Sequence, residues 1–133
     1  MADREFVQKW IEKAKQDFDY ASLSLDEEFE YFPQICWHFQ QAAEKYLKTY
    51  IVAYDLEFRK IYDLAALINI CGKKDPTFNL LLESCKHLQR YYIETRYPVV
   101  WEIKWKREDA INAKEAAKEI TDFVKERIAL FNV

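Results

Sequence analysis

Cationic and aromatic side chains gather in segment 90–98, where an expected helix meets a proline. Arg90 and Arg96 stand here beside three tyrosines, the last of which is Tyr97. Pro98 has no backbone N–H and restricts the residue before it, so we expect the helix to stop there. Helix ends leave carbonyl groups without partners, and guanidinium groups would meet them well. The same two groups beside stackable rings would equally suit a phosphate or a base, so both interpretations stay open.

A second set of polar side chains follows one edge of the helix expected over about residues 35–54. Its members recur every three or four residues and therefore share one stripe: Gln34, His38, Gln41, Lys45 and Lys48. The imidazole of His38 and the ammonium groups of Lys45 and Lys48 could hold a phosphate-bearing ligand. The alternative is a solvated helix edge on which Glu44 and Lys48 form an ordinary i, i+4 ion pair.

Residues for other kinds of chemistry are missing from the sequence. His38 and His87 are its only histidines and have no ligating spacing, so we expect no metal and no cofactor. A single glycine excludes a glycine-rich phosphate loop, and no serine or cysteine has a context that predicts activation by a histidine. The sequence therefore predicts no catalytic residue.

Two carboxylates, Asp17 and Asp19, lie on the first expected helix. An acid near an apolar stripe is usually held by a buried cation. We expect these acids to pair across the core with Arg90 or Arg96, in a structural role.

Length and composition indicate one domain over residues 1–133. The net charge of −3 excludes a protein that coats nucleic acid without specificity. Cys36, Cys71 and Cys85 have no C-x-x-C spacing, and the charged start of the chain has no signal-peptide core. No apolar run reaches the length that spans a membrane. We expect buried thiols in a reduced, cytoplasmic protein with no membrane insertion.

The spacing of apolar residues predicts an all-α fold, an antiparallel up-and-down bundle of four to five helices. The expected helices cover about residues 4–25 with Asp3 as cap, 35–54, 64–71, a stretch from Asp75 through Tyr92, and 107–131. Gly72, the only glycine, is expected to end the third helix in a left-handed conformation. The inward face of the last helix is expected to be Ala110, Ala113, Ala117, Ile120, Val124, Ile128 and Phe131.

Between the last two expected helices, Trp101, Ile103 and Trp105 alternate with charged residues. Period two indicates an extended segment with one apolar edge, for which the chain has no partner strand. Tryptophans among cations also suit a single strand of nucleic acid. The negative net charge and the use of tryptophan at interfaces favour a segment that folds back over the bundle or joins a subunit contact.

Residues 37–48, the tripeptide Tyr62-Asp63-Leu64 and segment 90–98 form an ordered set of motifs. They resemble, in turn, the second-helix motif, the His-Asp-Leu opening of the third helix and the Arg-Tyr-Pro signature of the HEPN domain (higher eukaryotes and prokaryotes nucleotide-binding). The resemblance covers nearly the whole chain and implies a helical bundle that commonly dimerises. It also implies a partner, because such prokaryotic proteins are often encoded beside a minimal nucleotidyltransferase, as a toxin–antitoxin or nucleotide-handling module.

Some members of that family are metal-independent ribonucleases with an Arg-x4-6-His motif at the dimer interface. No histidine follows Arg90 or Arg96 here, so the resemblance does not extend to that activity. Metal-free RNA cleavage needs a group that moves a proton near neutral pH as well as a cation, and arginine supplies only the cation. Tyr62 replaces the family's histidine, and apolar residues follow Pro98, which indicates a more apolar partner surface.

The sequence thus favours a non-catalytic, homodimeric HEPN-like protein that binds a nucleotide-type ligand, either nucleotide or RNA, or a nucleotidyltransferase partner. Its ligand-binding residues are expected to be Arg90, Arg96, Tyr97, Lys45, Lys48 and His38. Two alternatives stay open. One is a divergent metal-independent ribonuclease that brings His38 or His87 to the arginines, and the other is a purely structural interaction protein.

Overall fold

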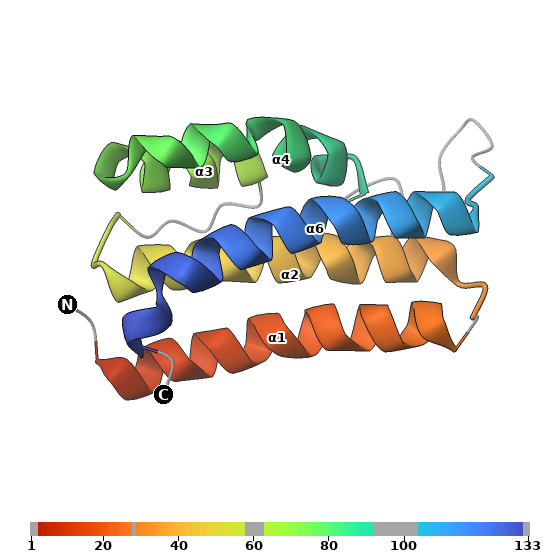
Figure 1. Cartoon of the computed structure of the whole chain (residues 1–133), viewed down its shortest axis with the longest axis horizontal. Helices are drawn as coiled ribbons and strands as arrows, with labels where there is room; N and C mark the ends of the chain where they lie inside the picture. Colours follow the sequence, from red (N-terminus) through yellow and green to blue (C-terminus); the bar gives the residue numbers. More distant parts are fainter. Residues whose placement is uncertain (1–2, 28, 58–62, 92–103, 132–133) are drawn as a thin grey trace.

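The computed structural model of the chain describes residues 3–27, 29–57, 63–91 and 104–131 (Figure 1). Its helical elements are α1 (Arg4–Asp26), α2 (Phe32–Ala53), α3 (Leu64–Lys74), η1 (Pro76–Leu81), α4 (Leu82–Gln89), α6 (Arg107–Arg127) and η2 (Ala129–Phe131). No residue in the described ranges lies in a strand, so the predicted all-α fold is confirmed. Over the same ranges, no helix has the length and apolar character needed to cross a membrane.

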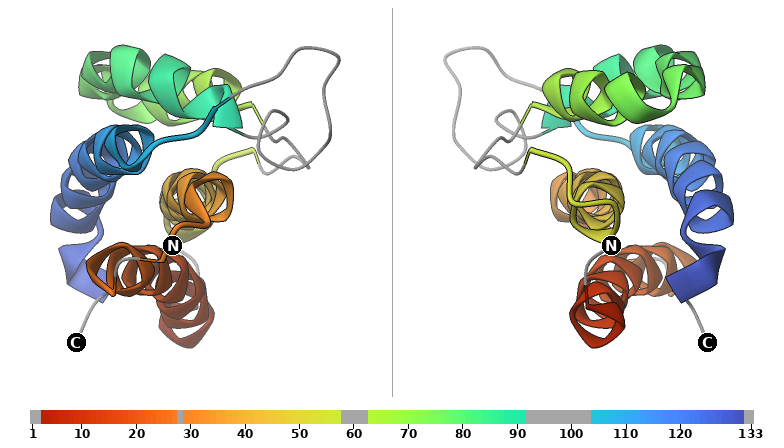
Figure 2. Two further views of the ribbon diagram at one scale, coloured as in Figure 1. Left: turned by 90° about the vertical axis from the view of Figure 1, so that its right-hand side faces the viewer. Right: turned by 90° about the vertical axis from the view of Figure 1, so that its left-hand side faces the viewer.

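The helices form a bundle in which α2 and α6 lie side by side between α1 and the α3–α4 hairpin (Figure 2). The Arg107 side chain donates a hydrogen bond of 3.0 Å to the Leu25 carbonyl, which joins the start of α6 to the end of α1. The Gln89 side chain accepts one of 2.8 Å from the Leu64 amide and joins the end of α4 to the start of α3. Both pairs are therefore antiparallel, as predicted.

The helices α2 and α6 run in the same direction. The Tyr54 hydroxyl, just after α2, donates a 2.9 Å hydrogen bond to the carbonyl of Arg127, the last residue of α6. The chain passes through the α3–α4 hairpin between these two helices. The bundle is thus antiparallel between α1 and both of its long neighbours, while those two neighbours are parallel.

Apolar periodicity predicts the core correctly. All seven residues expected on the inward face of the last helix are buried, and the small alanines among them let α6 approach α2 closely. The largest fully buried side chains include Tyr46, Phe39 and Phe78. The predicted buried thiols are also confirmed, since Cys36, Cys71 and Cys85 are free and buried, and burial raises the pKa of each to about 12.

Aspartates cap the starts of three helical segments, at Asp3, Asp63 and Asp75. Asp3 accepts a hydrogen bond of 3.1 Å from the Glu5 amide and caps α1, as the sequence predicts. Asp75 accepts one of 3.0 Å from the Thr77 amide, which confirms its capping role. The segment that Asp75 caps differs from the expectation, because it begins as the 3₁₀ turn η1 before it continues as α4.

Gly72 does not end α3, so this prediction is wrong. The helix runs on to Lys74, and no glycine has a positive φ. The apolar stripe of α3 ends at Cys71, but the next polar residues, Lys73 and Lys74, suit the negative end of a helix and extend it to the Asp75 cap. Helix termination here is set by charge and by the next cap rather than by glycine.

Segment 104–106 is irregular, and Trp105 packs partly buried against the core, 5.5 Å from the ring of Tyr91. This confirms that the end of the aromatic segment folds back over the bundle. The helix end expected at Pro98, together with Arg96, Tyr97 and Trp101, lies outside the described residues.

Because Gly72 lies within a helix at negative φ, we expect Gly72→Ala to stabilise the protein. A Cβ built at this position would meet only the Asn79 Oδ1 atom, at 3.7 Å, which is ordinary contact. Alanine loses less conformational entropy than glycine on folding, so the free energy of unfolding should rise by about 0.5–1 kcal/mol. Urea unfolding of both proteins measures this, and a less stable variant would show that the site cannot accept a methyl group.

Candidate functional site

The polar stripe of α2 meets a matching stripe of α1 along one edge of the bundle. Side chains of α1 at i, i+4, i+7, i+11 and i+14 face this edge: Phe6, Trp10, Lys13, Asp17 and Tyr20. His38 and Lys45 reach them from α2. We call these seven residues, with Lys9, the α1–α2 seam. The seam combines aromatic rings, four cationic or titratable nitrogen groups and one carboxylate.

Asp17 joins the two helices at the middle of the seam. Its Oδ1 atom lies 3.0 Å from Nδ1 of His38, and its Oδ2 atom accepts a hydrogen bond from the ammonium group of Lys45. The side chains are 14%, 26% and 31% exposed for Asp17, His38 and Lys45, so the cluster is shielded but reachable from solvent. Both acceptor oxygens of Asp17 are therefore in use within the protein.

The electrostatics of this cluster keep Asp17 ionised. Burial by itself would raise the pKa of Asp17, but the hydrogen bonds and charges of His38 and Lys45 outweigh burial and lower it. An ionised carboxylate only accepts hydrogen bonds, so Nδ1 of His38 must carry a proton. The other ring nitrogen, Nε2, is then the one that can accept a proton when the ring is neutral.

Asp17 does not pair with Arg90, so the Arg90 half of the expected pairing is wrong. Asp17 pairs with Lys45 and His38, while Asp19 pairs with Lys15 at 2.5 Å on the same helix. The rotation of α1 about its axis explains the difference, because Asp17 faces the edge of α2 rather than the core. Arg96, the other expected partner, lies outside the described residues.

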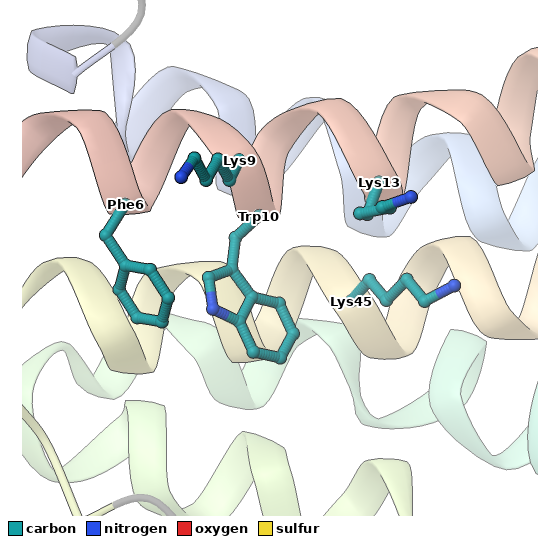
Figure 3. Close-up of a pocket in the computed structure, with 5 residues that line it drawn as sticks. All are labelled: Phe6, Lys9, Trp10, Lys13 and Lys45. Atoms are coloured by element: carbon teal, nitrogen blue, oxygen red, sulfur yellow. The ribbon is translucent and has the colours of Figure 1, made fainter.

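A hollow of about 250 Å³ opens beside this cluster (Figure 3). Its lining comes from both helices: Phe6, Lys9, Trp10, Lys13 and Lys45. Figure 3 shows the rings of Phe6 and Trp10 side by side, projecting from α1 over α2, with the lysines around them. Lysine stems form apolar walls while their ammonium groups stay in water at the rim.

The charge of this hollow is positive. Three of its five lining residues are lysines and none is a carboxylate. Within the described part of the chain, Lys9 and Lys13 form no ion pair with any carboxylate, and Lys45 pairs with Asp17. Rings that can stack and cations that can meet phosphate are the two features that a nucleotide requires of its site.

Lys48 is separated from this surface. It is 7% exposed and pairs at 3.3 Å with Glu44, which is 4% exposed. Burial raises the pKa of Glu44, and the nearby Lys48 opposes that rise. The i, i+4 pair is therefore present as predicted, but it is buried rather than a solvated helix edge.

Arg90 belongs to a different cluster. Its guanidinium carbon lies 5.1 Å from the ring centre of Tyr91 and 5.8 Å from that of Trp105. Its positive charge also acts on the Cys36 thiol, which is fully buried in the core. The structure therefore brings His38 and Lys45 together and places Arg90 with aromatic residues elsewhere. Tyr97, like Arg96, lies outside the described residues.

Sequence reasoning missed the contribution of α1 to the site. Phe6, Lys9, Trp10 and Lys13 were not identified, because the stripe Val7, Ile11 and Ala14 explained that helix as a core element. A usable signal was present, since Phe6, Trp10, Lys13 and Asp17 form a second stripe one position before the inward one. Large aromatic residues off the core stripe are candidates for a binding surface.

A second hollow, of about 330 Å³, lies between α4 and α6 and has the opposite character. Its lining includes Glu83, Glu115 and Glu119 together with Ser84 and His87. The Ser84 hydroxyl donates a hydrogen bond of 2.7 Å to Glu119. Three carboxylates repel a phosphate, so this hollow is not a site for an anion.

In the described ranges, no three histidine, cysteine or acidic side chains come together as a metal site would require.

We expect the contribution of Asp17 to the free energy of unfolding to depend on pH. In Asp17→Asn, His38 and Lys45 lose a charged acceptor, so the free energy of unfolding should fall by about 1–3 kcal/mol near neutral pH. In the folded protein, pairing lowers the pKa of Asp17 below its ordinary value of 3.8. The stabilisation is therefore fully present above pH 3.8 and is lost as the pH falls through the lowered pKa of the folded protein. Urea unfolding at several pH values would show the two proteins converging in acid.

Asp19→Asn is the matched control for this measurement. Asp19 is 57% exposed and, among the described residues, pairs with Lys15, so its loss should change the free energy of unfolding by no more than about 0.5 kcal/mol. Equal effects of the two substitutions, or a difference that persists in acid, would contradict a special role for Asp17.

Comparison with known proteins agrees with this architecture. The HEPN domain profile matches residues 7–127. The chain is similar to the crystal structure of TT1696 from Thermus thermophilus, with a TM-score of 0.80 and 28% identity over 90% of this chain and 96% of that one. It is also similar to ST0689, an archaeal HEPN homologue, with a TM-score of 0.73 and 25% identity over 92% and 97% of the two chains. Comparison with curated proteins gave no significant match. The resemblance indicated by the three sequence motifs is confirmed, and the chain belongs to the HEPN domain family.

Proposed function

We propose that this protein binds a nucleotide-type ligand in the hollow of the α1–α2 seam and does not act on it chemically. The observation that supports this proposal is the lining of the hollow, which joins two aromatic rings to three lysines and includes no carboxylate. Of the residues expected from sequence, Lys45 lines this hollow, and His38 is joined to it through Asp17. Lys48 is buried in its own ion pair and is left out of it.

The chemistry of the seam suits the two ends of a nucleotide. The rings of Phe6 and Trp10 offer an apolar face on which a base can stack, and each stacked base contributes about 1–3 kcal/mol. Lys9 and Lys13 can meet the phosphates as mobile point charges. Binding of this kind depends on local positive charge and is compatible with a net charge of −3, to which the acidic hollow between α4 and α6 contributes.

Family membership supports the remaining part of the proposal, a homodimer with a minimal nucleotidyltransferase partner in a toxin–antitoxin or nucleotide-handling module. Arg90, with Arg96 and Tyr97, would meet acidic groups of that partner. The exposed position of Arg90 on a platform of Tyr91 and Trp105 is compatible with this role. Light scattering against the chain mass of 16.1 kDa tests the dimer, and copurification with the product of a neighbouring gene tests the partner.

Titration calorimetry with ATP and GTP tests the ligand. We expect wild-type protein to bind. The double variant Lys13→Met/Lys45→Met should bind about tenfold more weakly or worse, because the two lost phosphate contacts together should cost about 1.4 kcal/mol of binding free energy or more. Methionine keeps the apolar stem and removes only the charge. Trp10→Ala should weaken binding by about tenfold or more, through the lost stacking surface.

Lys118→Met is the matched control. Lys118 is 61% exposed on α6 and pairs with Asp122, so it carries the same charge away from the seam. It should leave the affinity unchanged. Absence of binding by wild-type protein, or equal affinity in the double variant and the control, would contradict the proposed site.

A second candidate function is metal-independent cleavage of RNA at the same seam, and one observation favours it. Asp17 holds Nδ1 of His38, and Lys45 supplies a cation next to the ring. A neutral His38 could take the proton of a 2′-hydroxyl at Nε2 while the 2′-oxygen bonds to phosphorus and the bond to the 5′-oxygen breaks. The leaving oxygen would take a proton from water, and Lys45 would stabilise the negative charge on the phosphate. This arrangement replaces the family's arginine and histidine motif with different residues.

Incubation of total RNA with the purified protein in EDTA separates the two candidates. The binding proposal predicts intact RNA with wild-type protein, because it gives the seam no part in breaking the phosphodiester bond. Cleavage by wild type and by His87→Ala, but not by His38→Ala, would establish the second candidate instead. Cleavage that survives in His38→Ala would point to a contaminating nuclease.

A further inference from the structure

We infer that the turn between α1 and α2 is a docking surface for a basic segment of another protein that also carries apolar side chains. The surface consists of Tyr20, Leu23, Phe29 and Tyr31 with the acidic residues around them, and we call it the turn patch. It lies where α1 ends and α2 begins, at the opposite end of the bundle from the start of α1 and from η2 (Figure 1). The turn patch shares no residue with the lining of the hollow in the seam.

Exposed apolar side chains are concentrated at this turn. Within the described ranges, eight large hydrophobic side chains are exposed, and four of them fall between residues 20 and 31. Their exposed fractions are 59% for Tyr20 and Leu23, 54% for Phe29 and 70% for Tyr31. At roughly 100 Å² each, these side chains leave about 400 Å² in water. A patch of this size matches the largest one on a typical monomer, and such patches are often sites of interaction.

Hydrogen bonds of the backbone position the four side chains on both sides of the turn. Tyr20 and Leu23 are i, i+3 neighbours on α1. The Phe29 amide donates a hydrogen bond of 3.2 Å to the Ser24 carbonyl, which brings Phe29 back against the last turn of α1. Tyr31 is the N-cap residue of α2, and its carbonyl accepts a hydrogen bond of 3.1 Å from the first turn of that helix. The apolar side chains are therefore presented by ordered backbone at one end of the bundle.

The charge around these apolar side chains is negative. Residues 16–37 contain no lysine or arginine and six acidic residues, which are Asp17, Asp19, Asp26, Glu27, Glu28 and Glu30. Asp26, Glu27 and Glu30 are exposed, and none of the three forms an ion pair with another described residue. Arg107, at the start of α6, donates to the Leu25 carbonyl instead. Carboxylates without partners beside an apolar patch complement lysine and arginine side chains of a protein partner.

These features favour a basic segment over other occupants. In an isologous contact, a second copy of the chain would bring an identical acidic patch against this one, and like charges repel. The exposed apolar area is also only about half of the roughly 800 Å² that each partner contributes to a standard interface. A short segment needs less area, and cations placed around apolar side chains would match both parts of the patch. A phosphate-bearing ligand or an anionic membrane would be repelled by the carboxylates.

Fluorescence anisotropy with three labelled peptides tests this docking surface. The first probe, acetyl-Lys-Phe-Lys-Leu-Lys-Phe-Lys-amide, carries cations and apolar side chains together. The second probe has glutamate in place of each lysine, and the third has serine in place of each apolar residue. Wild-type protein should bind the first probe about tenfold more tightly than either of the others, because charge and apolar contact both contribute. This affinity should fall as the salt concentration rises, because salt screens exposed charges.

A pair of double variants tests the apolar part of the patch. Phe29→Ser/Tyr31→Ser should weaken binding of the first probe about tenfold, through the lost aromatic contacts. Leu80→Ser/Leu130→Ser is the matched control, because these side chains are 74% and 63% exposed on η1 and η2, away from the turn. It should leave the affinity unchanged. Circular dichroism of each variant confirms that it is folded.

A second pair tests the acidic part. Glu27→Gln/Glu30→Gln should weaken binding of the first probe about threefold or more, because two carboxylates lose their charge next to the peptide. Glu83→Gln/Glu115→Gln removes the same charge from the acidic hollow between α4 and α6, and it should leave the affinity within about twofold of wild type.

Three results would overturn the assignment of the turn patch. The first is binding of the first probe no tighter than that of the other two peptides. The second is an equal effect of the turn variants and their matched controls, which would place the peptide elsewhere on the protein. The third is a dimer in light scattering that Phe29→Ser/Tyr31→Ser converts to a monomer, because the patch would then be a contact between two copies. AMP binding at the seam is a separate measurement, and each of these results leaves it unchanged.

Discussion

The burial of α2 is the constraint on which the rest of this structure depends. Fourteen of its 22 residues are buried, because α1, α6 and the α3–α4 hairpin cover it on several sides. A polar side chain on a helix covered in this way costs free energy unless it finds a partner. Glu44 and Lys48 meet this condition by pairing with each other inside the bundle. His38 and Lys45 meet it at the edge, where α1 supplies Asp17.

This pairing fixes the surface that we assign to a ligand. Because Asp17 holds two side chains of α2, the two helices present their polar edges to solvent in one defined register. Tertiary hydrogen bonds tie both ends of α1 to the end of the chain, from Arg107 at the start of α6 to the Leu25 carbonyl and from Arg4 to the Leu130 carbonyl in η2. Rigid elements position a site more accurately than loops do. The seam therefore owes its geometry to the packing of the core.

Much of the fold could be predicted from sequence, and the reasons why the rest could not are physical. The inward face of α6 follows from apolar spacing, because burial of that stripe dominates the placement of a helix. Gly72 could not be placed in the same way, since the end of α3 is decided by Lys73, Lys74 and the Asp75 cap. The partner of Asp17 depends on the rotation of α1 about its axis, which residue types alone do not determine. For the same reason Trp10 and Lys13 were not recognised, although they lie one position from the core stripe.

An NMR titration with AMP, followed in amide and indole ¹H–¹⁵N spectra, tests the central claim most directly. Our account predicts that the largest shifts fall on the Trp10 indole and on the amides of residues 6–17 and 38–45. Residues of the acidic hollow between α4 and α6, such as Glu115, should not shift. Shifts that cluster around Arg90 and Trp105, or that appear in the acidic hollow, would place the ligand elsewhere and contradict the assignment of the seam.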